Sequence, residues 1–340
     1  MLRLEIDDSR WLDLVERSTT ALPFHHPAWS RLIAHCYGYR SFALALADDA
    51  GQPVSGVPVI DVSSRLAGRR WISLAFTDFC PPLSVDAGFL DELVRRLELD
   101  RRAAGVACLE VRSELPGPNV ARRSDYVLHR LELEPDPDAL SRRFRSEQRR
   151  RINVARRAGV TVTRASTHSE LVDVFYRLHL RTRRRQGVPI QPRRFFDMLW
   201  ERIVQPGLGF CLLAFVRGIP VAGAVFLAWK HAVTYKYGAS DERFLDCRPN
   251  HLLFWEALAW SCENGFREFD FGRTDLANAG LRQFKRSWRA LEEPLVYSVL
   301  GDVPAPGRVR RGGTVLGTII RHSPPLVCRA AGELFYKYAA

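Results

Sequence analysis

Lysine and methionine are scarce in this chain of 340 residues, and its cysteines form no recognisable motif. Two residues are Met, and four of the 50 basic residues are Lys: Lys230, Lys236, Lys285 and Lys337. Such an arginine excess is typical of a GC-rich genome, so a Lys is better evidence of a function than any single Arg. The seven Cys are scattered without a CxxC or Cys/His spacing, which predicts buried free thiols, a reducing compartment and no metal site.

Long hydrophobic runs and common nucleotide-binding motifs are also missing. The longest apolar stretch, 208–229, is interrupted by Arg217, Gly218, Pro220 and Gly223, a pattern typical of a β-hairpin rather than a membrane span. The segment MLRLEIDDSRWLDLVERS has no apolar core like that of a signal peptide. No P-loop, GxGxxG, HExxH or Ser/His/Asp elbow occurs. We therefore expect a cytoplasmic protein without a tightly bound cofactor.

Positive charge is present, but it is concentrated in one segment. Residues 141–200 hold 16 basic and 4 acidic residues, a net charge of +12 that equals the charge of the whole chain. Eight Arg lie between 142 and 157, and RTRRRQG follows at 181–187. Because the planar Arg fork bonds two phosphate oxygens at once, we expect an anionic partner here. A diphosphate-linked substrate, a tRNA acceptor stem and anionic lipid at the inner membrane face all fit; the alternative is a solvated helix face.

The two halves of the chain repeat one order of elements. Residues 42–60 and 210–227 each read as an apolar strand, a polar turn and a second strand with Pro-Val-x-Gly. The elements expected to follow are strand 70–76, helix 87–104 and strand 106–112 in the first half, and strand 231–239, helix 250–264 and strand 267–272 in the second. This order predicts an α/β fold of tandem duplicated units, each a mixed, mostly antiparallel sheet flanked by helices.

These patterns also suggest how the chain is divided. We expect an N-terminal unit over 1–138, a basic linking helix over 139–158, a C-terminal unit over 159–300 that carries the main site, and an accessory helical tail over 301–340. Within the second unit, Asn250 is the expected N-cap of helix 250–264 and Gly265 its C-cap.

Several motifs together indicate a family. The segments YKYGASD, RPNHLLFWEAL, GFREFDFGRTD and GLRQFKRSW, with FHHPAWSRLIAHCYGYRSF, FTDFCPPL and RRRINVARRAGV upstream, resemble the FemAB-like branch of the GNAT-type acyltransferases. The resemblance implies two GNAT-like units, which agrees with the repeated order, and acyl transfer to an amine. Members of this branch add amino acids from aminoacyl-tRNA to peptidoglycan precursors, and others act in exopolysaccharide pathways.

The resemblance also implies catalytic residues. Lys285 in GLRQFKRSW matches a Lys that the peptidoglycan ligases present near the reacting carbonyl, where a cation stabilises the developing oxyanion. Asp270 and Arg273 in FDFGRTD lie at the carboxyl end of an expected central strand, where open α/β sheets place ligands. Asp270 is predicted to accept the proton of the amine, for which the substrate's own phosphate is the alternative acceptor, or to pair with Arg273 as a structural ion pair.

One candidate binding residue comes from the resemblance, and the others come from their positions on the expected strand and helix. Arg185 matches an Arg that contacts a nucleotide-linked sugar. Tyr237, expected to face the same way as Tyr235, belongs either to a core stripe or to a substrate wall. Asn250 and His251 begin a helix whose N-terminus accepts anions. The segment DCRPNHLLF, however, lacks the glycine loop with which coenzyme A enzymes hold pyrophosphate, and its Pro removes an N–H. The donor, acyl-CoA or aminoacyl-tRNA, stays open.

The first half offers one further candidate, Asp78, in the loop after its third strand. We expect an N-acyl- or aminoacyltransferase that forms an amide on an amino group of a phosphate-bearing peptidoglycan or exopolysaccharide precursor, with peripheral contact to the inner membrane face. The alternative is a non-catalytic basic module that binds nucleic acid or the membrane surface. Few aromatic residues interleave the basic segment, which argues against stacking of single strands.

Overall fold

Two compact units make up the protein. The structure is a computed structural model that describes residues 1–64, 68–303 and 317–339. The first unit comprises Met1–Val127 with Pro294–Pro304, and the second comprises Leu128–Glu293 with Ala305–Ala339. The division falls inside two long strands, β7 (Ala121–Glu132) and β14 (Leu291–Gly301), whereas we expected boundaries at 138 and 300.

The first unit is a sheet with the strand order β1-β2-β3-β4-β6-β14. Adjacent strands of this sheet are antiparallel, except that β4 and β6 run parallel to each other. Its core contains Phe42, Trp71, Leu97 and Leu109. The elements are β1 (Leu2–Glu5), α1 (Ser9–Arg17), η1 (Pro23–His25), α2 (Pro27–Tyr37), β2 (Arg40–Ala47), β3 (Pro53–Ser64), β4 (Gly68–Ser73), β5 (Leu83–Ser84), α3 (Phe89–Ala103) and β6 (Cys108–Val111).

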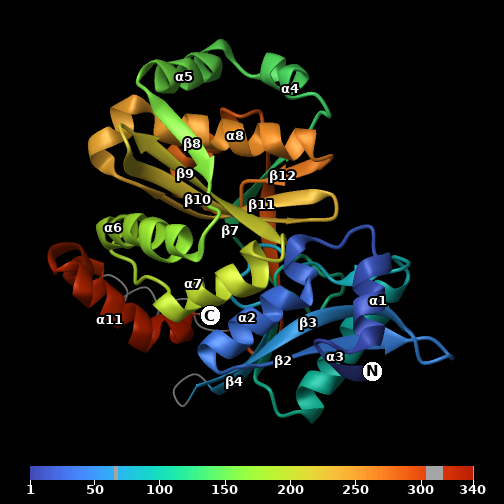
Figure 1. Ribbon diagram of the computed structural model, residues 1–340. Coiled ribbons are helices and arrows are strands. Elements are labelled where there is room, and N and C mark those ends of the chain that lie inside the picture. Colours follow the sequence, from blue (N-terminus) through green and yellow to red (C-terminus); the bar gives the residue numbers. More distant parts are fainter. Residues whose placement is uncertain (65–67, 304–316, 340) are drawn as a thin grey trace. The chain divides into compact units, whose positions relative to one another are not determined.

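The second unit has the strand order β7-β12-β11-β10-β9-β8, in which only β11 and β12 run parallel. In Figure 1, α5 and α8 cover one face of this sheet, and α6 and α7 cover the other. The elements are α4 (Pro137–Arg143), α5 (Ser146–Arg157), β8 (Val160–Arg164), η2 (Glu170–Phe175), α6 (Tyr176–Gln186), α7 (Arg193–Leu199), η3 (Trp200–Val204), β9 (Gly209–Val216), β10 (Ile219–Trp229), β11 (Ala232–Ser240), η4 (Glu242–Cys247), α8 (Pro249–Glu263), β12 (Glu268–Asp270), β13 (Thr274–Asp275), α9 (Ala279–Arg286), α11 (Pro325–Phe335) and η5 (Tyr336–Ala339).

The two units share one topology. In the first, β2, β3 and β4 are consecutive antiparallel strands, and α3 crosses over to β6, which pairs parallel with β4. In the second, β9, β10 and β11 repeat the antiparallel order, and α8 crosses over to β12, which pairs parallel with β11. The predicted fold class, tandem units with mixed and mostly antiparallel sheets, is confirmed.

Helix α8 begins earlier than the sequence suggested. The residue before the helix is Arg248, in the left-handed conformation with φ of 55°. Pro249 occupies the first helical position, where its missing N–H has no intrahelical partner in any case and its fixed φ suits the helix. The expectation that Asn250 is the N-cap is therefore wrong, because Asn250 lies within the first turn.

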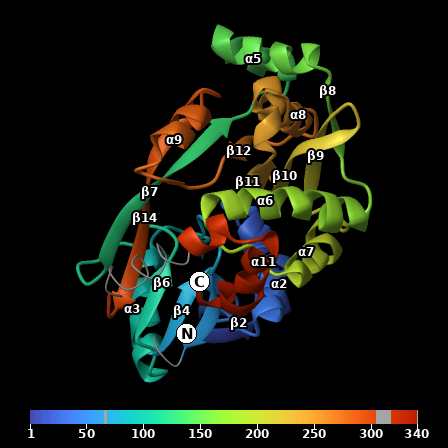
Figure 2. The same cartoon turned by 90° about the vertical axis from the view of Figure 1, so that its left-hand side faces the viewer.

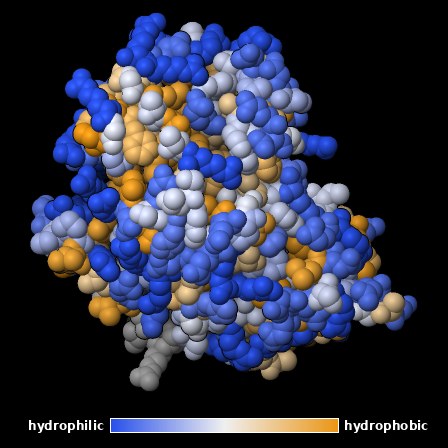
Figure 3. Space-filling view, viewed as in Figure 1, coloured by the Kyte–Doolittle hydropathy of each residue, from blue (hydrophilic) through white to orange (hydrophobic). Residues whose placement is uncertain are grey.

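The basic segment forms two helices, so the expected single helix over 139–158 is also wrong. Phe144 adopts an extended conformation between α4 and α5. Its buried ring packs edge-on against Trp255 and Trp288, with centroids 5.9 and 5.4 Å away. This contact turns the chain and anchors the segment on the core of the second unit. Hydrophilic side chains gather over these helices at the top of Figure 3.

The described part of the tail is helical and packs on the second unit. A Cβ at Gly332 of α11 would overlap the carbonyl oxygen of Ile190, and Arg184 Nε donates to Ser323 O at 2.7 Å. The rest of the predicted tail, residues 304–316 and 340, lies outside the described residues.

The cysteines match their expected state. All seven are free thiols, and six of them are buried, Cys247 being half-buried. Burial raises the pKa of Cys80 to about 12 and that of Cys262 to about 11. Among the residues that the structure describes, no helix has the length and apolarity needed to cross a membrane.

Candidate functional site

The sheet of the second unit opens where β11 and β12 separate. The two parallel strands pair only as far as Thr234 and Asp270, although β11 continues to Ser240. A cavity of about 230 Å³ lies beside this point and is lined by residues of β10, β11, α6, α8 and α9. It brings together three of the predicted site residues, Arg185, Asn250 and Lys285.

Lys285 is the buried cation of this cavity. It lies on α9 and is 2% exposed, and its Nζ donates to the carbonyl oxygens of Gly272 at 2.7 Å and Arg273 at 3.2 Å. Figure 2 shows α9 beside the end of β12, from which this turn departs. Burying an ammonium group is costly unless it is hydrogen-bonded, so the two carbonyls stabilise Lys285 in this position.

Asp270 holds the same turn from the other side. Its carboxylate is 3% exposed, and Oδ1 accepts from Gly272 N at 2.7 Å. The peptide groups of Gly272 therefore link Asp270, through the N–H, to Lys285, through the C=O. The structure brings the two predicted catalytic residues and Arg273 into one hydrogen-bonded turn, but Asp270 is not among the residues that line the cavity.

A buried histidine lies within electrostatic range of Lys285. His129 on β7 is fully buried, and its Nε2 lies 3.0 Å from Glu292 Oε2, which is also close to Arg282. Burial, followed by the positive charge of Lys285, lowers the pKa of His129 to about 4. The hydrogen bond from Arg282 is the main cause that lowers the pKa of Glu292 to about 2. His129 is therefore neutral and Glu292 ionised at neutral pH.

Arg185 and Asn250 face the cavity from two helices. Arg185 lies in the last turn of α6, and its Nη1 is 3.4 Å from Glu242 Oε2. Asn250 lies in the first turn of α8, where N–H groups without intrahelical partners favour anions. Both residues can therefore bind a polar or anionic part of a ligand near Lys285.

Tyr237 does not share a face with Tyr235. The register of β10 and β11 shifts between Val225 and Phe226, so Lys236 is an extra residue on β11. A bulge of this kind turns the residues on its two sides to opposite faces of the sheet. Tyr235 lines the cavity, whereas Tyr237 packs against aromatic residues on the face that α6 and α7 cover. The expectation that they face the same way is wrong.

His251 is a core residue beside the cavity. It is 8% exposed and packs against Phe284 and Trp288, and it is not among the residues that line the cavity. Neither ring nitrogen has a hydrogen-bond partner in the described part of the chain. Burial, followed by the charges of Arg151 and Arg248, lowers the pKa of His251 to about 4.

Asp78 belongs to the first unit. It is half-buried in the loop after β4, and its carbonyl oxygen accepts from Tyr297 Oη at 2.8 Å. The structure thus gives Asp78 a backbone contact within its own unit, and the role of its carboxylate stays a prediction.

Comparisons with known proteins agree with this architecture. Residues 142–286 match the model of the acetyltransferase (GNAT) domain. The lipid II:glycine glycyltransferase of Staphylococcus haemolyticus (strain JCSC1435) is 35% identical over 78 residues, which cover 21% of this chain and 19% of that relative. Residues 142–286 thus form a GNAT-type domain, and the chain spans about a fifth of the length of the curated relative that it matches.

Solved structures are similar over most of the chain. The crystal structure of FemX matches with a TM-score of 0.70 and 14% identity, covering 88% of this chain and 97% of that chain. A tandem GNAT protein from the clavulanic acid biosynthesis pathway matches with a TM-score of 0.54 and 13% identity, covering 89% and 98%. At these identities the matches show the fold alone. The GNAT domain contains Arg185, Asn250, Asp270 and Lys285.

Proposed function

We propose that this protein is an N-acyltransferase that forms an amide on an amino group of a cell-envelope precursor, with the cavity at Lys285 as its active site. The observation that carries the proposal is the buried ammonium group of Lys285, which lines a cavity of the GNAT domain together with Arg185 and Asn250.

The chemistry follows from the charges that the reaction develops. The amine nitrogen attacks the carbonyl carbon of an ester or thioester, so that an N–C bond forms and the C–O or C–S bond breaks. Negative charge accumulates on the carbonyl oxygen, and a fixed cation in a site shielded from water stabilises it. Lys285 supplies this cation, and the proton lost by the amine is taken up by the leaving group. Asp270 acts as a positioning residue, since its carboxylate orients the turn that holds Lys285.

The acceptor is a phosphate-bearing precursor. The relatives named as lipid II:glycine glycyltransferases favour the peptidoglycan branch over the exopolysaccharide branch, and favour a transferase over a non-catalytic basic module. Arg185 is suited to a phosphate of this precursor. A lipid-linked precursor would bring the protein to the inner membrane face.

The donor is an aminoacyl or acyl ester or thioester. The left-handed Arg248 precedes α8 and Pro249 is its first residue, at the place where coenzyme A enzymes offer glycine N–H groups to pyrophosphate. This favours aminoacyl-tRNA over acyl-CoA, and an assay with both donors distinguishes them.

Replacing Lys285 tests the proposal. Lys285→Met keeps an unbranched side chain that is one heavy atom shorter and removes the cation, and we expect kcat to fall by roughly 100- to 1,000-fold, the usual effect of losing one oxyanion-stabilising group. Lys230→Met, which removes a lysine outside the cavity, is the matched control. Amide formation on a lipid-linked peptidoglycan precursor is followed by mass spectrometry with aminoacyl-tRNA or acyl-CoA as donor. Undiminished turnover by a folded Lys285→Met variant would refute the role of Lys285.

A further inference from the structure

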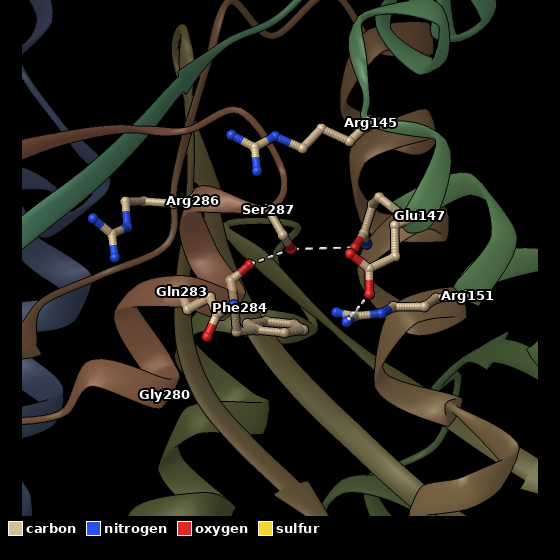
Figure 4. Close-up of a pocket in the computed structure, with 9 residues that line it drawn as sticks. Arg145, Glu147, Arg151, Gly280, Gln283, Phe284, Arg286 and Ser287 are labelled. Carbon is tan, nitrogen blue, oxygen red and sulfur yellow. Dashed lines mark hydrogen bonds and ion pairs between the residues drawn. The ribbon is translucent and has the colours of Figure 1, made fainter.

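A second cavity, of about 480 Å³, lies between α5 and α9 in the GNAT domain. Figure 4 shows Arg145, Glu147 and Arg151 on the side of α5, and Gln283, Arg286 and Ser287 on the side of α9. Phe284 lines both this cavity and the cavity at Lys285. The two spaces are therefore neighbours on α9.

The lining of the second cavity is predominantly cationic. Three arginines, Arg145, Arg151 and Arg286, and one carboxylate, that of Glu147, line it, and in Figure 4 the guanidinium group of Arg286 points away from Glu147. Glu147 pairs with Arg151, and Arg286 Nε lies 3.8 Å from Glu292 Oε2. The side chain of Arg145 makes no hydrogen bond or ion pair with any described residue, which leaves its charge available to a ligand.

A buried donor group also lines this cavity. Gln148 is 1% exposed, and its Oε1 accepts from Ser287 Oγ at 3.1 Å. Its Nε2 is buried and has no hydrogen-bond partner in the described part of the chain. A buried donor left unpaired costs free energy, so a ligand that accepts a hydrogen bond from Gln148 Nε2 would be favoured.

We propose that this cavity binds a phosphate group of the acyl donor. Phosphate matches the lining because each guanidinium can bond two of its oxygens and the Gln148 amide can donate to a further one. The proposal rests on the proposed function, because the donor's reacting ester or thioester would then lie in the adjoining cavity at Lys285. The diphosphate of coenzyme A and a phosphodiester of tRNA share this chemistry.

Binding of inorganic pyrophosphate to the full chain tests the site without turnover. We expect Arg145→Ala and Arg286→Ala each to weaken binding in calorimetry by about tenfold, the usual loss for one charge-assisted hydrogen bond. The matched control is Arg157→Ala, since Arg157 is an exposed residue at the end of the same helix, about 9 Å beyond Arg151. Thermal melting verifies that the variants are folded.

A second variant moves the affinity in the opposite direction. Glu147→Gln removes the one carboxylate of the lining, so we expect pyrophosphate to bind more tightly, by about threefold or more, because like-charge repulsion is relieved. Equal affinities for the parent and for all four variants, or no binding of pyrophosphate, would overturn the proposal.

Two competition experiments identify the source of the phosphate. Coenzyme A or an uncharged tRNA acceptor-stem hairpin is titrated against bound pyrophosphate. If coenzyme A or the hairpin displaces pyrophosphate, and Arg145→Ala weakens this displacement, the site is supported and the displacing molecule identifies the class of donor. If neither molecule displaces pyrophosphate, the proposal is overturned. Loss of turnover in Lys285→Met with intact pyrophosphate binding separates failure of the active site from failure of this one.

Discussion

Lys285 is positioned by the backbone of a turn. Its ammonium donates to the carbonyl oxygens of Gly272 and Arg273, while the N–H of Gly272 is held by Asp270. Because these hydrogen bonds hold the ammonium group to the turn, a residue outside the cavity helps to set its position. Asp270 therefore matters for where the cation lies as well as for local charge.

Substitutions of Asp270 separate positioning from proton transfer. Asp270→Ala removes the acceptor for Gly272 N, and we expect kcat to fall about 10- to 100-fold because the cation is misplaced. Asp270→Asn keeps an acceptor oxygen, so turnover should stay within about threefold of the parent. Steady-state kinetics on folded variants checks this. If Asp270 accepted the proton of the amine, the Asn and Ala variants would lose activity equally.

At the scale of elements, one irregularity in β11 decides which aromatic residue reaches the cavity. The extra residue Lys236 turns Tyr235 toward the cavity and Tyr237 toward the opposite face. Gly238 completes the arrangement, because a Cβ at this position would overlap Tyr235 Oη. The position of Tyr235 in the cavity thus depends on the bulge at Lys236 and on the absence of a side chain at Gly238.

A double-mutant cycle tests this packing. Gly238→Ala should lower the free energy of unfolding by about 1–3 kcal/mol, since the added methyl group overpacks against the Tyr235 ring. Tyr235→Ala in the same chain removes the clash, so the two changes should couple by at least about 0.5 kcal/mol. Urea denaturation of the parent, both single variants and the double variant measures the coupling. Strictly additive effects would show that the ring and the glycine do not meet.

At the scale of the whole molecule, three buried histidines tie stability to pH. His129 faces Lys285 and Glu292, His179 faces Arg183 and Gln191, and His251 faces Arg151 and Arg248. Burial is the largest cause in each, and it lowers the pKa values to about 4, 3 and 4. All three are in the second unit, and none is exposed by more than 8%.

The free energy of unfolding should therefore fall as the pH is lowered from 6.5 toward 4. In that window the unfolded chain binds protons that the folded chain does not, at up to about 1.4 kcal/mol per pH unit for each histidine. His251→Phe keeps an aromatic ring packed against Phe284 and Trp288. It should reduce the slope of the unfolding free energy against pH by the contribution of one histidine. Denaturant unfolding at pH 7, 5.5 and 4.5 measures this. Parallel curves for parent and variant would exclude the contribution of His251.

The sequence alone determined features that local patterns encode. Alternating apolar runs and turn residues fixed the repeated order of elements, because each strand and helix shows its own periodicity. A rare Lys in a motif of the FemAB-like branch pointed to Lys285, and the charge of residues 141–200 pointed to an anionic ligand. We propose the cavity between α5 and α9 as the place where that ligand binds.

Only the tertiary structure decided the features that depend on distant pairing. The bulge at Lys236, which reversed the expected direction of Tyr237, arises from the register with β10. His129 and Glu292 meet although they are 163 positions apart in the sequence, so no local spacing could reveal this pair. Arg185, Asn250 and Lys285 lie on three helices and share a cavity because β11 and β12 separate beyond Asp270. Local propensity specifies each element, whereas burial and strand register specify which side chains meet.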